Sequence, residues 1–77
     1  MALDLHGTSI HEGWQCFKRE VDDAFHRKVK AFKVITGKGQ MLQEFPIWGT
    51  NHPRVREVKL NTDGGSFKVI LKKDTTL

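Results

Sequence analysis

The 77-residue sequence has very little cysteine and no long apolar run. Its single cysteine, Cys16, excludes an internal disulfide and is typical of a reducing compartment. No apolar stretch approaches the roughly 18 residues that a membrane-spanning helix requires. Because Met1 is followed at once by strand-like sequence, we expect no signal peptide. These absences predict a cytoplasmic protein without a membrane partner.

Several ligand-binding motifs are also missing. The four histidines and one cysteine form neither C-x-x-C nor H-E-x-x-H, so a zinc site is not expected. His11, His26 and His52 are instead predicted to lie on the surface of helices or loops. The phosphate-loop and dinucleotide-binding glycine motifs are absent as well. The sequence therefore predicts neither a metal nor a cofactor.

The charged residues are unevenly distributed along the chain. Thirteen Lys and Arg against nine Asp and Glu give a net charge of +4. Residues 1–27 hold three bases and five acids, whereas residues 28–77 hold ten bases and four acids. The basic part would suit phosphate or another polyanion, and it would equally suit an ordinary solvated surface. The length and the 38% hydrophobic content predict a single globular domain over residues 1–77.

Hydrophobic periodicity predicts the order strand, helix, strand, helix, strand, strand. A capping box formed by Ser9 and Glu12 indicates the start of the first helix, whose apolar stripe continues to Phe25. Pro46 lies either inside the second helix or in its first turn. The strands are expected over about residues 2–6, 31–36, 54–60 and 66–72, and a flexible tail over residues 72–77.

The connections between these segments predict the architecture. A strand-helix-strand unit crosses over right-handedly and makes its two strands parallel, whereas the last two strands form an antiparallel pair. The third strand carries so much charge that an edge position is expected. Both helices then pack on one face of a four-stranded mixed sheet, in a two-layer α+β fold. Asp4, His6, Lys68 and Lys72 are predicted to lie on the open face.

Polar residues follow the first two predicted strands where each strand ends. If the strands are parallel neighbours, their carboxyl ends meet at one edge of the sheet, and His6 lies beside the turn at residues 36–39. The glycines of this turn let backbone N–H groups approach an anion, and Lys38 adds an ammonium. On a phosphodiester, His6 could take or give a proton, Asp4 could orient its ring, and Lys38 could neutralise developing charge.

These residues also carry a family resemblance. The chain resembles the small MutS-related (Smr) domain over essentially its whole length, including the family signatures L-D-x-H-G near the start and H-G-x-G in the middle. The second signature has Thr at its first position in some members, as it does here. The matching segments, in order, are Leu3-Asp4-Leu5-His6-Gly7, Thr36-Gly37-Lys38-Gly39, Phe45-Pro46-Ile47-Trp48, His52-Pro53-Arg54-Val55 and the Gly64-Gly65 turn.

The resemblance implies a βαβαββ fold similar to the C-terminal domain of bacterial translation initiation factor 3. It also implies a nuclease of RNA, or of DNA in some members, and the family includes proteins that cut messenger RNA at stalled ribosomes. Carried over by motif, Asp4 and His6 would be the cleavage residues, and residues 36–39 would contact the nucleic-acid backbone. The chain departs from the family at Thr36, where many members have a second histidine, and at Ser66-Phe67, where a further Gly-Ala often follows the turn.

Two main hypotheses about function follow. The first is a metal-independent endonuclease that cleaves RNA or nicks DNA, with Asp4 and His6 as catalytic residues. The alternative is an RNA-, DNA- or ribosome-binding module that does not cut, and a small-molecule phosphoesterase is a third option. We expect the protein to be a monomer. The nucleic-acid-binding residues are predicted to be Thr36, Gly37, Lys38, Gly39, Lys68 and Lys72.

Overall fold

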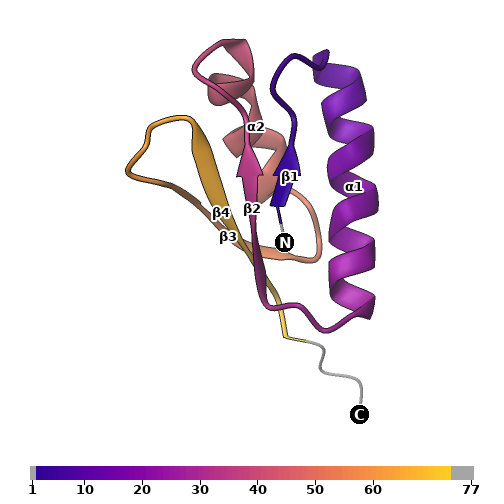
Figure 1. Ribbon diagram of the computed structural model, residues 1–77. Coiled ribbons are helices and arrows are strands. Elements are labelled where there is room, and N and C mark those ends of the chain that lie inside the picture. Colours follow the sequence, from indigo (N-terminus) through magenta and orange to yellow (C-terminus); the bar gives the residue numbers. More distant parts are fainter. Residues whose placement is uncertain (1, 74–77) are drawn as a thin grey trace.

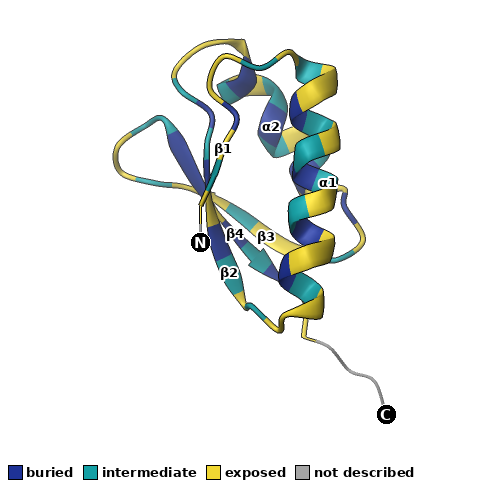
Figure 2. Ribbon diagram, turned by 45° about the vertical axis from the view of Figure 1, so that its right-hand side comes forward, coloured by how far each residue is buried: buried dark blue, intermediate teal, exposed yellow. Residues whose placement is uncertain are grey.

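The computed structural model describes residues 2–73, in which both helices cover the same face of a four-stranded sheet (Figures 1 and 2). This arrangement confirms the predicted two-layer α+β fold. Residues 74–77, most of the predicted tail, lie outside the described residues. The elements are β1 (Ala2–Asp4), α1 (Ile10–His26), β2 (Ala31–Ile35), α2 (Gln40–Thr50), β3 (Val55–Leu60) and β4 (Ser66–Leu71).

The sheet has the strand order β1-β2-β4-β3. β1 and β2 are parallel neighbours, and β4 pairs antiparallel with both β2 and β3. These pairings confirm the predicted parallel pair, the predicted antiparallel pair of the last two strands and the edge position of the charged strand β3. Because β1 and β2 run the same way, the turns that follow them lie together at one end of the sheet, at the top of Figure 1.

β1 is shorter than the predicted strand over residues 2–6. The backbone N–H of Leu5 still donates to the carbonyl of Ile35 at 2.7 Å, but the chain then turns. Gly7 has a φ of +82°, and the N–H of Thr8 donates to the carbonyl of Leu5 at 3.1 Å. His6 therefore lies in a turn, and strand alternation does not determine where its side chain points.

The start of α1 is capped as predicted by Ser9. Its hydroxyl oxygen accepts a hydrogen bond from the N–H of Glu12 at 3.1 Å. The carboxylate of Glu12 accepts from the hydroxyl of Ser9, so it does not close the box on the backbone N–H. A Cβ at Gly13 would lie 2.7 Å from Cε of Met41. The glycine thus marks the close approach of α1 to α2, in which Pro46 lies inside the helix.

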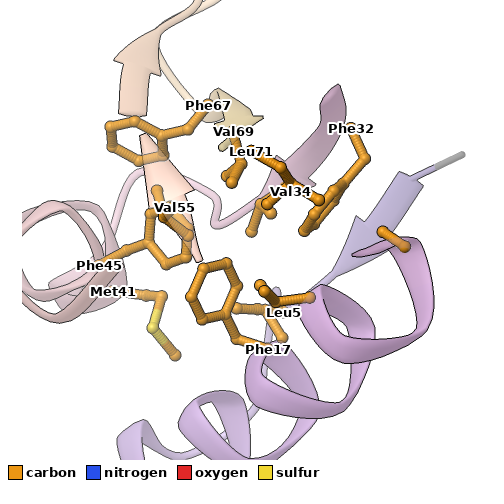
Figure 3. Packing of buried hydrophobic residues seen from close by; sticks show 12 residues of the cluster. Leu5, Phe17, Phe32, Val34, Met41, Phe45, Val55, Phe67, Val69 and Leu71 are labelled. Atoms are coloured by element: carbon orange, nitrogen blue, oxygen red, sulfur yellow. The ribbon is translucent and has the colours of Figure 1, made fainter. Parts of the chain in front are cut away.

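The core fills the space between the sheet and the helices (Figure 3). Phe17 of α1 is fully buried, and its ring packs edge-on against that of Phe45 with centroids 5.0 Å apart. Neither helix within residues 2–73 is long and apolar enough to cross a membrane. The buried apolar side chains are Leu5, Phe17, Val21, Ala24, Phe32, Val34, Met41, Phe45, Val55, Phe67, Val69 and Leu71.

The prediction that His52 lies on the surface is wrong. Its side chain is only 9% exposed and packs edge-on against the rings of Trp14 and Phe17. Nδ1 of His52 accepts a hydrogen bond from the backbone N–H of Arg54 at 3.1 Å. This bond fixes the ring against the backbone of its own loop. Burial lowers the pKa of His52 below its ordinary value of 6.5, although Asp22 opposes this shift. His11 and His26 are exposed, as predicted.

Candidate functional site

The turn after β1 and the loop after β2 meet at the imidazole of His6. A Cβ on Gly37 would lie 2.9 Å from Cδ2 of His6, so the ring lies directly against the glycine backbone. Gly37 also has a φ of +73°, a conformation that side chains other than glycine adopt only with strain. The structure thus brings the imidazole and the glycine loop together at the carboxyl ends of two parallel strands.

The carboxylate of Asp4 contacts His6 through the backbone. Oδ1 of Asp4 accepts a hydrogen bond from the N–H of His6 at 2.9 Å, and this bond forms part of the turn. We expected the carboxylate to orient the imidazole directly. In the structure, Asp4 instead fixes the backbone from which the imidazole projects, because the chain leaves the strand conformation before His6.

The turn between β3 and β4 supports the loop after β2. The carbonyl of Gly65 accepts from the N–H groups of Thr36 and Gly37 at 3.0 and 2.9 Å. Asp63 holds this turn, because its carboxylate accepts from the N–H of Gly65 and from the hydroxyl of Ser66. The hydrogen bond from Gly65 and that from Ser66 hold the pKa of Asp63 below its usual value.

Sequence reasoning missed this supporting role of Asp63. The available signal was its position before Gly64-Gly65, since an aspartate at that place commonly accepts a hydrogen bond from the backbone two residues on. Motif spacing gave no indication that the turn contacts residues 36–37, because that contact joins segments 29 residues apart.

Thr36 and Lys38 contribute to the loop in different ways. The side chain of Thr36 is 3% exposed, and its hydroxyl donates to the carbonyls of Gly37 and Gly65. It therefore stabilises the loop from inside. Lys38 is exposed, and its aliphatic chain lies along the β3–β4 turn, with Cε 3.9 Å from the position of a Cβ on Gly64. Its ammonium forms no ion pair within residues 2–73.

A cleft of about 300 Å³ opens where these segments meet. Both helices begin at its wall, and α2 has neither a side-chain cap nor an acidic residue in its first turn. Free N–H groups at a helix start and the partial positive charge there favour an anion. His6 and Lys38 are the titratable residues of the lining, which comprises Leu5, His6, Gly7, Thr8, Ser9, Ile10, Thr36, Lys38, Gly39, Gln40 and Met41.

Three lysines form a row across the open face of the sheet. Lys68 of β4 lies in register between Lys33 of β2 and Lys59 of β3. Directly opposed like charges destabilise a sheet unless other groups neutralise them. Two members of the row have acidic partners, since Lys33 lies 3.8 Å from Asp63 and Lys59 lies 3.7 Å from Glu57.

The two predicted binding lysines outside the loop occupy different places. Lys68 lies on the open face between the two ends of the sheet. Lys72 follows β4 at the end opposite the cleft, where its N–H donates to the carbonyl of Arg54. The structure therefore does not bring Lys72 to the cleft. Within residues 2–73, no three His, Cys, Asp or Glu side chains gather as potential metal ligands.

Comparison with known proteins decides the family. The family model of the Smr domain matches residues 3–71. The chain belongs to the Smr domain family. Its structure is also similar to the crystal structure of the Smr domain of Thermus thermophilus MutS2, with a TM-score of 0.83 and 18% sequence identity. The match covers 92% of this chain and 96% of that one. No curated protein sequence matches the chain.

The Smr family is associated with nuclease and nucleic-acid-binding roles. In this Smr domain, the two signature segments supply the imidazole and the glycine loop that form the wall of the cleft. Position 36 holds a buried threonine, so the cleft has the imidazole of His6 without a second one beside it. Any acid-base chemistry in this cleft must therefore use His6 as its histidine.

Proposed function

We propose that this Smr domain is an endonuclease that cleaves RNA in the cleft at His6. The observation that carries the proposal is the contact between the His6 ring and Gly37, beside a cleft lined by Lys38 and the start of α2. Such a cleft would bind the phosphate, and the ring beside it would reach the oxygens around that phosphate. Phosphodiester cleavage needs this pairing of charge stabilisation with proton transfer.

The reaction is an attack of the RNA 2′-hydroxyl on the neighbouring phosphorus. His6 accepts the 2′-hydroxyl proton as the 2′-oxygen–phosphorus bond forms. The bond from phosphorus to the 5′-oxygen breaks, and that oxygen takes up a proton from the imidazolium or from water. The products are a 2′,3′-cyclic phosphate and a free 5′-hydroxyl. Lys38 and the N–H groups at the start of α2 stabilise charge on the other phosphate oxygens.

Asp4 acts in this proposal as a positioning residue. Its carboxylate holds the N–H of His6 and so fixes the turn from which the imidazole reaches the cleft. Asp63 and Gly65 act in the same way on the other side, because they hold residues 36 and 37 in place. We propose that the reaction proceeds without a metal ion.

Cleavage of a labelled RNA by the wild-type protein in EDTA tests this function. We expect products that end in a cyclic phosphate. An RNA with one 2′-deoxynucleotide should remain intact at that linkage, because the attacking hydroxyl is missing. Complete loss of cleavage in EDTA would contradict the metal-free reaction, and cleavage at the deoxy linkage would contradict attack by the 2′-hydroxyl.

A second candidate function is a nucleic-acid-binding module that does not cut. The buried side chain of Thr36 favours it, because a loop without an imidazole offers no second histidine to protonate the leaving group. The same assay separates the two functions when RNA binding is measured as the salt concentration rises. Binding that falls steeply with salt, without any product, would favour the binding module.

A further inference from the structure

A second cationic groove lies at the end of the molecule opposite the cleft. It has a volume of about 460 Å³ and is formed by the end of α1, the α1–β2 connection, β3 and the end of β4 with the residues that follow it. In Figure 1 the α1–β2 connection and the end of β4 lie together at the bottom, away from the turns that follow β1 and β2. The described lining comprises Phe25, Lys28, Val29, Lys30, Arg56, Ile70, Leu71, Lys72 and Lys73.

The groove combines five cations with an apolar floor. None of its described lining residues is acidic, and none of the five cations forms an ion pair within residues 2–73. By contrast, the neighbouring cations Arg27 and Arg54 are paired with Asp23 and Asp22. The guanidinium of Arg54 also lies 4.4 Å from the centre of the Phe25 ring, which forms part of the floor. Five of the nine Lys and Arg side chains without an ion pair within residues 2–73 thus line this one groove.

An unusual backbone conformation brings Lys28 into this groove. α1 ends in a Schellman motif, in which the N–H of Lys28 donates to Phe25 and that of Val29 donates to Ala24. The second residue from the end of this motif, which Lys28 occupies here, is normally glycine, because its φ is positive. Lys28 adopts a φ of +61° and is the only non-glycine residue within 2–73 with a positive φ. Folding alone favours glycine at this position.

A second irregularity occurs at Arg56. β3 has a bulge between Val55 and Glu57, so that Arg56 has no partner on β4. A bulge redirects the side chain of the extra residue, and here that side chain lines the groove. Two independent departures from regular backbone, in a helix end and in an edge strand, thus bring cations to the same groove.

We propose that this groove is a second binding site for the phosphate backbone of single-stranded RNA, and this proposal rests on the RNA binding that the proposed function requires of the cleft. Unpaired cations without acids suit a run of phosphates, and the apolar floor, which includes Val29 and Ile70, suits the apolar edge of a ribose or base. α1 spans about 25 Å between the two sites. At about 3.4 Å per stacked nucleotide, one strand of roughly seven nucleotides connects them. Lys68 lies on the open face between them.

The test is the binding of a fluorescent RNA of about 12 nucleotides, long enough to reach both sites, to a Lys28→Gln/Arg56→Gln double variant. We expect weaker binding and a slope of log affinity against log salt that is shallower by about 1.4, because about 0.7 is lost per phosphate contact. The control is Lys18→Gln/Arg19→Gln, which removes the same charge from α1 at residues that line neither the cleft nor the groove. It should retain most of the wild-type affinity and slope.

Equal RNA affinity and slope in the groove variant and the control would overturn the proposal. A groove variant that loses binding to polyglutamate but not to RNA would also overturn it, because the groove would then bind acidic peptides. Since the measurement is binding, a wild-type protein that does not cleave would contradict the nuclease and leave the groove proposal standing. If the groove variant both cleaves and binds RNA as the wild-type protein does, the result would contradict only the groove proposal.

Discussion

At the scale of single residues, the position of the His6 imidazole depends on a missing side chain. Gly37 leaves room for the ring, and any Cβ there would lie 2.9 Å from it. Gly7 and Gly64 have similar positive φ values, but a Cβ on either would meet no atom closer than 3.9 Å. Backbone conformation explains those two glycines, whereas Gly37 is also required by contact with the candidate catalytic ring.

His52 should make the stability of the protein depend on pH. Burial lowers its pKa in the folded state, so the unfolded chain binds the proton more readily. The contribution is fully present above the unfolded pKa of about 6.5 and is lost as the pH falls toward the lowered folded value. Urea unfolding at several pH values should therefore give a free energy of unfolding that decreases as the pH falls below this point.

The His52→Gln variant should reduce this pH dependence and also weaken packing against Trp14. His11→Gln, at an exposed position of α1, is the matched control and should keep the wild-type pH dependence. The prediction concerns how steeply the free energy of unfolding changes with pH, and not its absolute value. A His52→Gln variant whose stability still falls as steeply between neutral and mildly acidic pH would contradict it.

At the scale of elements, the positive φ of Lys28 at the end of α1 lowers the free energy of unfolding. Replacing Lys28 with glycine should raise the free energy of unfolding by about 0.5 to 1 kcal/mol, because glycine adopts this φ without strain. Urea unfolding at neutral pH measures the change. Lys30→Ala removes a charge from the same groove at a residue without positive φ, so it separates backbone strain from charge repulsion. Equal stabilisation by both variants would mean that repulsion, not strain, is being relieved.

At the scale of the whole molecule, local pattern was sufficient to predict the fold. The alternation in β2 and β4, the helical stripe that includes Phe17, and the charge of β3 each depend on neighbours in sequence, and each is confirmed. The error at His52 occurs where contacts between distant segments decide the outcome. His52 is buried by rings of α1, and a local pattern contains no information about that contact.

The candidate site could be predicted in part for the same reason. Parallel pairing of β1 with β2 brought His6 to residues 36–39, as the topology required. The backbone contact of Asp4, the contact of the Asp63 turn with residues 36–37 and the groove at the other end could not be inferred. They depend on a turn, on a contact across 29 residues and on a bulge, none of which has a periodic signature.

The most direct test of the account is the cleavage rate of the His6→Ala variant. Measured under single turnover, with saturating protein and a labelled RNA, the rate should fall by about 10²- to 10⁴-fold, as expected when general acid-base help is lost. RNA affinity should change little, because Lys38 and the helix starts remain in place. A variant that binds RNA normally and cleaves it at the wild-type rate would contradict the central claim that His6 performs the chemistry.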